Sequence, residues 1–145
     1  MDEPVTEMST AECWEFLRRQ ELGRLAFRLV DEVHLVPVNY AVDHDPVTDR
    51  RTILFRTAEG SKLLGVVMHG DVALEADELV DEHAASVVVR GRAWLLDEHE
   101  AHRADTLPLR PWVPTPRYGV VEIDPVEVTG RRFALDRPWR HMLPG

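Results

Sequence analysis

Segments in which apolar and polar residues alternate recur along this chain, and they constrain the fold more than any other feature. Leu25, Phe27 and Leu29 are separated by charged or small residues, as in a strand with one buried face. The strict succession of strand and helix that marks a parallel α/β sheet is absent. The sequence therefore predicts a mainly β protein, a small six-stranded antiparallel barrel with flanking helices.

Helix and strand signals divide the chain further. Ser9-Thr10-Ala11-Glu12 has the form of a capping box and predicts a helix over about residues 10–20. Further helices are expected at about 60–68 and 97–106, and a proline-rich loop at 107–117. Strands are expected at 25–29, 33–42, 52–57, 72–77, 85–96 and 118–133, with a turn at Asp31-Glu32 and an acidic loop at 77–82. Pro37 cannot donate to a ladder, which places it at an edge or a bulge.

Length and charge limit the classes of function. The 145 residues fit one domain, expected over 9–145 behind an acidic arm at 1–8. A net charge of −9 without a basic stripe argues against nucleic acid as a partner. The apolar stretches are too short to cross a membrane, the start of the chain does not resemble a leader, and Cys13 is alone. We therefore expect a cytoplasmic protein without a membrane partner.

Common catalytic and metal-binding motifs are absent from the sequence. It contains no glycine-rich dinucleotide or P-loop motif, no G-x-S-x-G and no paired cysteines. His99 and His102 share a spacing of three without a third ligand, which favours a solvated helix face, so no metal site is predicted. Cys13 lies on an apolar stripe and is expected in the core.

One segment has the composition of a phosphate site. Arg56, Thr57, Ser61 and Lys62 lie around Gly60 where a strand gives way to a predicted helix, and Lys62 is the only lysine of the chain. Free amide hydrogens at a helix start, hydroxyl groups and cations together attract a phosphate. The same residues would also suit an ordinary capped helix. Spacing alone leaves both interpretations open.

The order of several short motifs carries a family resemblance. They are Gly23-Arg24-Leu25-Ala26, Val36-Pro37-Val38-Asn39-Tyr40, Phe55-Arg56-Thr57 with Gly60-Ser61-Lys62, Ser86 to Ala93, and Val128-Thr129-Gly130-Arg131-Arg132. Over about residues 9–133 this pattern resembles the pyridoxamine 5'-phosphate oxidase-like family, and within it small actinobacterial members akin to nitroimidazole-resistance proteins. The resemblance implies a Greek-key split β-barrel that binds FMN and forms a homodimer, with the flavin between the subunits.

The resemblance also implies roles for individual residues. In the family, positions matching Thr57, Ser61 and Lys62 hold the FMN phosphate, with Arg56 alongside. The strand matching Val36, Pro37, Val38 and Asn39 lies along the flavin ring, and the position of Ser86 contacts the flavin. Plain barrel core is the alternative for residues 36–39. Arg110 and Trp112, in the proline-rich loop, are candidates for the mouth of the groove, with plugging of the barrel end as the alternative for Trp112.

The function that follows is a flavin-dependent oxidoreductase. Hydride transfer at the flavin N5 atom would need a positioned cofactor rather than a side-chain nucleophile, which agrees with the missing catalytic motifs. The substrate does not carry over from the resemblance: nitroimidazole-resistance proteins often have a histidine at the position of Arg56, and the chain is shorter than the vitamin B6 oxidase. The alternatives are a non-catalytic module for flavin, deazaflavin or haem, a deazaflavin-dependent reductase, and a regulatory protein without a redox role.

Overall fold

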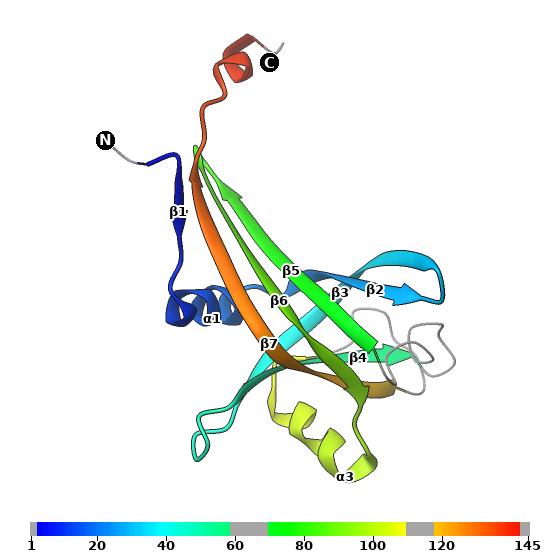
Figure 1. Ribbon diagram of the computed structural model, residues 1–145. Coiled ribbons are helices and arrows are strands. Elements are labelled where there is room, and N and C mark those ends of the chain that lie inside the picture. The colour runs from blue at the N-terminus through cyan, green and yellow to red at the C-terminus, as the bar shows by residue number, and fades with distance from the viewer. Residues whose placement is uncertain (1–2, 59–69, 110–117, 143–145) are drawn as a thin grey trace.

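The computed structural model describes residues 3–58, 70–109 and 118–142. Strands dominate it, with a single full helix near the start of the chain (Figure 1). The elements are β1 (Val5–Glu7), α1 (Thr10–Arg19), β2 (Leu22–Leu29), β3 (Glu32–His44), β4 (Arg51–Ala58), β5 (Gly70–Val80), β6 (His83–Leu95), α3 (Glu98–Ala101), the 3-10 helix η1 (His102–Thr106), β7 (Tyr118–Ala134) and the 3-10 helix η2 (Pro138–Met142).

All the strands lie in one antiparallel sheet that closes on itself. Their order is β1-β7-β4-β3-β2-β5-β6, and an additional ladder joins β6 to β7. β7 pairs with β4 through residues 118–123, with β6 through 121–134 and with β1 through 131–133. The closed ladder confirms the predicted barrel, in which few strand edges remain open.

A β-bulge lies where β7 passes from one partner to the next. Arg90 of β6 pairs with Glu127, but the following residue, Gly91, pairs with Pro125, so Val126 has no cross-strand partner in this ladder. A Cβ atom at Gly91 would collide with the backbone oxygen of Asp124, which explains the glycine. Bulges bend a strand and increase its twist, and this one helps the long β7 to curve around the barrel.

Helix α1 begins at a capping box and covers one opening of the barrel. The Ser9 hydroxyl accepts a hydrogen bond from the backbone N–H of Glu12, whose carboxylate accepts one from the N–H of Ser9. Cys13, Phe16 and Leu17 are fully buried in the main core. Burial raises the pKa of the Cys13 thiol, consistent with the expected core residue rather than a nucleophile.

A second, smaller core lies on the outer side of β4. Leu54 and Val120 point away from the main core and pack against Ala104 and Leu109 of the segment that follows β6. Because this segment covers β4, residues 52–55 are all buried, although alternate residues of a strand point to opposite faces. β4 is therefore a central strand with a core on each side.

The sequence underestimated the number of strands. There are seven rather than six, because residues 5–7 of the expected acidic arm form β1 and pair with β7. The expected acidic loop at 77–82 is wrong as well: β5 and β6 continue to a tight hairpin at Asp81 and Glu82. The preceding turn lies at Val30 and Asp31, one residue earlier than expected. The expected helix at 60–68 and residues 110–117 of the expected loop lie outside the described residues.

No helix in the described part of the chain combines the length and the apolar character needed to cross a membrane. β5, β6 and β7 run together toward the end of the molecule where the described chain begins and ends, and η2 stands away from the barrel there (Figure 1). Arg137 holds this C-terminal segment to the hairpin by donating to the backbone oxygen of Asp81 at 2.6 Å.

Candidate functional site

Strands β3 and β4 pair over only half their length and then part. Their ladder runs from His44 with Arg51 to Tyr40 with Phe55. In the direction of residues 39 to 36, β3 continues as a partner of β2 alone, while β4 continues to Ala58 as a partner of β7. If the ladder continued, Asn39 would face Arg56 and Val38 would face Thr57. The strand predicted to follow the flavin ring and the strand predicted to reach its phosphate thus form the two arms of one fork.

The backbone along this part of β3 is available on one side. Residues 32–39 pair with β2, and no ladder among the described residues pairs their other side. This confirms the predicted edge position of Pro37. Along such an edge, half of the backbone N–H and C=O groups point away from the paired strand. These free groups can form hydrogen bonds with the donors and acceptors on the rim of a flat ring. The described residues of the fork therefore fit a flavin.

Side chains on this stretch of β3 alternate between the core and the surface. Val36 and Val38 pack against the main core, so the barrel-core interpretation holds for their side chains. Asn39 is half-buried and Pro37 is exposed. The outward positions also include Leu35, which is 68% exposed. Any contact of Val36 and Val38 with a ring would therefore come from the backbone.

Arg56 is engaged within the protein. Its Nε donates to the backbone oxygen of Leu109 at 3.1 Å, and its guanidinium lies 3.6 Å from Asp105. The side chain is 23% exposed. In the described residues Arg56 therefore holds the segment after β6 against β4. Thr57, the next residue, is buried at the arm of the fork and has an interaction partner.

Ser86 lies apart from the fork. It pairs across the sheet with Asp77, and its hydroxyl donates to Glu75 at 2.8 Å. Glu75 also lies 3.4 Å from Arg24, which pairs in register with Pro37. Ser86 and Pro37 are thus three strand spacings apart, about 14 Å across the sheet, and are offset by a further two residues along the strands. A single flavin lying along Pro37 would meet Ser86 of the same chain only by crossing this distance.

Four predicted site residues lie outside the described residues, namely Ser61, Lys62, Arg110 and Trp112. The described residues contain no group of three or more His, Cys, Asp and Glu side chains that could hold a metal ion. A hollow of about 510 Å³ lies elsewhere, between β1, the tip of the β5–β6 hairpin and the end of β7, and its lining includes none of the predicted flavin residues.

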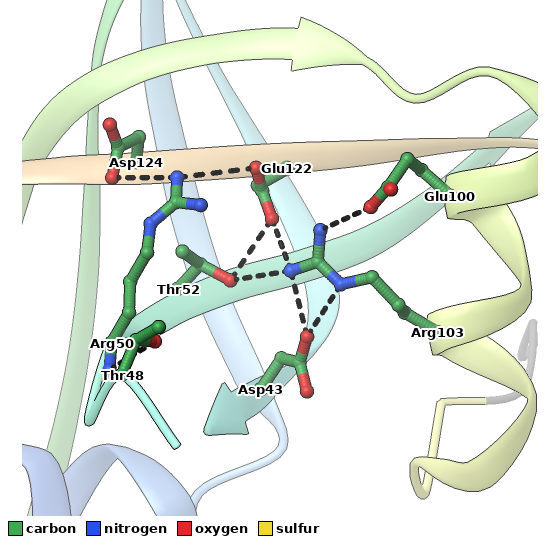
Figure 2. Close-up of polar contacts among 8 residues, drawn as sticks. All are labelled: Asp43, Thr48, Arg50, Thr52, Glu100, Arg103, Glu122 and Asp124. Carbon is green, nitrogen blue, oxygen red and sulfur yellow. Dashed lines mark hydrogen bonds and ion pairs between the residues drawn. The ribbon is translucent and has the colours of Figure 1, made fainter. Parts of the chain in front are cut away.

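The sequence analysis missed a buried ionic network at the paired end of β3 and β4, away from the fork (Figure 2). Arg103 of η1 reaches over the sheet and lies 2.7 Å from Asp43 of β3. The same guanidinium bonds to Glu122 of β7 and donates to Thr52 of β4 at 3.2 Å. Glu122 is only 2% exposed. Figure 2 shows one arginine from the covering segment joined to three neighbouring strands.

Three further charged residues, Glu100, Arg50 and Asp124, extend this network. Glu100 accepts a hydrogen bond from Arg103 at 3.2 Å, and Arg50 lies 3.6 Å from Glu122 and 3.1 Å from Asp124. Partial burial lowers the pKa of Arg103, but the hydrogen bonds that its guanidinium donates to Asp43 and Glu122 outweigh this effect and raise the pKa. The guanidinium therefore stays charged at any pH at which the protein folds.

One signal in the sequence points to this burial. Glu122 occupies a polar position of an alternating strand, which by itself indicates a solvent-facing side chain. Thr52 to Phe55, however, form a strand of mainly apolar residues without alternation, typical of a strand covered on both faces. A covered face on β4 requires that its neighbours on that face, including Glu122, be covered too.

Comparison with known proteins agrees with this fold. The sequence profile of the family described as pyridoxamine 5'-phosphate oxidase matches residues 9–132. The chain belongs to the pyridoxamine 5'-phosphate oxidase family. The family match spans every described element from α1 to most of β7, and so includes both arms of the fork.

Several similar proteins come from Mycobacterium and Corynebacterium. The FAD binding protein from Mycobacterium smegmatis is 37% identical, with a TM-score of 0.79, and the match covers 90% of this chain and 100% of that one. A protein of Corynebacterium glutamicum is 42% identical, with a TM-score of 0.78 over 94% of this chain and 98% of its own. An uncharacterized protein of Mycobacterium tuberculosis is 44% identical over 87 residues, covering 57% of this chain and 76% of its own. The FAD and heme binding protein from Mycobacterium smegmatis, at 12% identity and a TM-score of 0.69, shares the fold alone.

Proposed function

We propose that this chain binds FMN and uses it to transfer a hydride, at the flavin N5 atom, to or from a small-molecule substrate in the cytoplasm. The observation that carries the proposal is the fork between β3 and β4, one arm of which holds Val36 to Asn39, predicted for the ring, and the other Thr57, predicted for the phosphate. Family membership supports it, as does a 37% identical relative that is named as an FAD binding protein.

The residues of this chain would divide the binding between them. The backbone of Val36 to Asn39 would orient the ring, and the Thr57 hydroxyl with Ser61 and Lys62 would hold the phosphate. The flavin, when bound, supplies the redox chemistry, so the protein has to provide position and a suitable electrostatic environment. Arg56, engaged with Asp105 and Leu109, supports the phosphate arm rather than serving as a free cation.

We further propose that the protein acts as a homodimer with the flavin between two copies. Pro37 and Ser86 are separated in one chain by about 14 Å across the sheet and by a further two residues along the strands, so a flavin along Pro37 of one copy is more readily met by Ser86 of the other. The exposed apolar side chains on the outer face of β3, Val33 at 75% and Leu35 at 68%, would be covered by such a partner.

Replacing Lys62 with Ala tests the phosphate site. A hydrogen bond to a charged group contributes roughly 1.5 to 3 kcal/mol, so FMN should bind about 10- to 150-fold more weakly. Riboflavin, which has the same ring without the phosphate, should bind both proteins almost equally. Flavin fluorescence titration measures both affinities, with Arg92→Ala as the control because that arginine is 76% exposed and lies on β6.

Each outcome of this titration has a definite meaning. Equal weakening of FMN and riboflavin would place Lys62 at the ring or in the fold, and no change would leave only a capped helix at this segment. Tighter binding of FAD, a deazaflavin or haem than of FMN would overturn the cofactor assignment. The visible absorption spectrum of the purified protein distinguishes flavin, deazaflavin and haem directly.

A flavin-binding module without catalytic activity is the second candidate. The observation that favours it is that the 37% identical Mycobacterium smegmatis relative is named for FAD binding and not for a reaction. Reduction of the bound flavin by a nicotinamide or deazaflavin donor, followed by its reoxidation over many cycles, supports the enzyme. Bound flavin that no such donor reduces supports the module.

A further inference from the structure

Two arginines attach the segment that covers β4, residues 98–109, to the sheet: one belongs to the segment and the other to the sheet. Arg103 extends from the segment to the sheet, where it bonds to Asp43 and Glu122. Arg56 extends from the sheet to the segment, where it bonds to Leu109 and pairs with Asp105. The apolar contacts of the second core lie between these two attachments.

The position of this segment bears on the fork. Arg56, which the segment engages, directly precedes Thr57 on the phosphate arm. Leu109, which Arg56 holds and which is 1% exposed, directly precedes the residues predicted to line the mouth, Arg110 and Trp112. Whatever fixes the segment on the sheet therefore also fixes Leu109 and Arg56, and with them the surroundings of Thr57.

Arg103 is the residue best placed to fix it. Its side chain contacts β3, β4 and β7 at once, through Asp43, Thr52 and Glu122. The planar guanidinium matches several acceptors in fixed directions, which a lysine ammonium does not. Glu122, at 2% exposure, has Arg50 at 3.6 Å as its other cation, so it depends mainly on Arg103 for a partner.

We propose that Arg103 is a positioning residue for the cofactor site, which it does not touch. Its bonds to Asp43 and Glu122 hold residues 98–109 on the sheet, and this segment, through Arg56, in turn sets the geometry of the phosphate arm at Thr57. The proposal rests on the proposed flavin site and adds to it a residue remote from the fork.

Replacing Arg103 alone would combine two effects: loss of the link between the segment and the sheet, and loss of the partner of a buried carboxylate. In Arg103→Met the carboxylate of Glu122 would stay buried with a weak partner, which destabilises a protein strongly. The double variant Arg103→Met/Glu122→Gln removes both charges, and with them this penalty, while the link stays broken. Arg103→Lys keeps the positive charge but loses the several fixed N–H donors of the planar guanidinium. Arg90→Met is the control, since its single ion pair with Glu127 is exposed at both partners.

Two measurements on these variants decide the proposal. Hydrogen exchange on the protein without flavin should become faster over residues 98–109 in the double variant and remain as in wild type in Arg90→Met. FMN affinity should fall roughly 2- to 30-fold in the double variant, be partly restored in Arg103→Lys and be unchanged in Arg90→Met. The thermal midpoint of the double variant should stay near that of wild type, which separates positioning from loss of fold.

Three results would overturn the proposal. Unchanged exchange over 98–109 would mean that Arg103 does not hold the segment. Faster exchange with wild-type FMN affinity would mean that the segment does not position the site. Equal loss of affinity in Arg103→Lys and in the double variant would deny the role of the guanidinium geometry. Failure of wild-type protein to bind FMN is a separate result: it refutes the proposed function, and the coupling to the cofactor with it.

Discussion

Glu75 lies in the middle of a polar group on the outer face of β2, β5 and β6. It accepts a hydrogen bond from Ser86 at 2.8 Å and lies 3.4 Å from Arg24, which also pairs with Asp77 at 3.1 Å. Burial raises the pKa of Glu75, and the neighbouring Asp77 adds to the increase, against the lowering effects of Ser86 and Arg24. The folded protein therefore holds a proton on Glu75 more tightly than the unfolded chain does.

Replacing Glu75 with Gln should stabilise the protein in a pH-dependent manner. As the pH rises above about 4.3, the unfolded chain releases this proton first, so wild type loses stability until the raised pKa is passed. Glutamine cannot ionise and keeps an acceptor for Ser86. The difference in thermal midpoint, variant minus wild type, should therefore increase as the pH rises from about 4 toward neutral, as followed by circular dichroism. A difference that falls with pH would contradict the raised pKa, and Glu98→Gln, on the exposed α3, is the control.

The sequence predicts the place of a residue well when the signal is local, and poorly when the residue's partner is far away along the chain. The sequence predicted Thr57 and Pro37 at their places, since strand ends and proline have local signatures. It did not predict that Arg56 pairs with Asp105, or that Arg103 pairs with Glu122. These partners come together only because the segment after β6 folds back over β4, and a linear pattern of charges does not contain that contact.

At the scale of elements, α1 is the part that depends most on its own sequence. The capping box of Ser9 and Glu12 satisfies donors at its start, and Arg132 of β7 lies 2.8 Å from the Glu12 carboxylate. The hydrogen bond from the Ser9 backbone, followed by that from Arg132, lowers the pKa of Glu12. The cap therefore keeps its charge in mildly acidic solution and links the helix to the barrel.

Ser9→Ala should destabilise the protein by about 0.5–2 kcal/mol, because it removes the acceptor for the Glu12 amide. Thr10→Ala is the matched control, since Thr10 is the next residue and is also exposed. Urea unfolding monitored by tryptophan fluorescence gives both values. Equal effects of the two substitutions would mean that the cap contributes nothing specific.

Elements with local signals were predicted well and elements defined by pairing were not. The helix expected at 10–20 is found at Thr10–Arg19, and the strand expected at 52–57 at Arg51–Ala58. The three residues of β1 carry no strand pattern that distinguishes them from a loop, and only their partners on β7 make them a strand. The acidic residues at 77–82 indicate a loop by their composition. The prediction is wrong because pairing with β6 extends the strand through this polar stretch.

At the scale of the whole molecule, the outer face of β3 exposes apolar side chains that no described part of the same chain covers. Val33, Leu35 and Pro37 point outward in succession beside Ala26 of β2. Natural monomers seldom expose a contiguous apolar patch of this kind without a function for it. The proposed dimer covers it, and the partner would contact these residues rather than Val36 and Val38, which pack against the core.

Leu35→Asp should therefore convert the dimer to a monomer. The residue is 68% exposed, so in a monomer the substitution should change the stability by no more than about 0.5 kcal/mol, whereas a charge in an apolar interface is costly. Sedimentation velocity at micromolar concentration measures the change. Val47→Asp, at a site that is 91% exposed in the β3–β4 turn, should leave the dimer intact. A wild-type monomer with FMN bound would contradict the proposed site between subunits.

The position of β7 in the chain has a consequence for biosynthesis. Each of the strands with which β7 pairs, β1, β4 and β6, precedes it, and its ladder with β1 joins residues more than a hundred positions apart. While a ribosome still holds residues 118–134, the earlier strands can form hairpins but cannot close the barrel. The edges of β4 and β6 then remain open to other chains, because unpaired strand edges are templates for aggregation. Closure of the barrel is thus a late, long-range event in the synthesis of the chain.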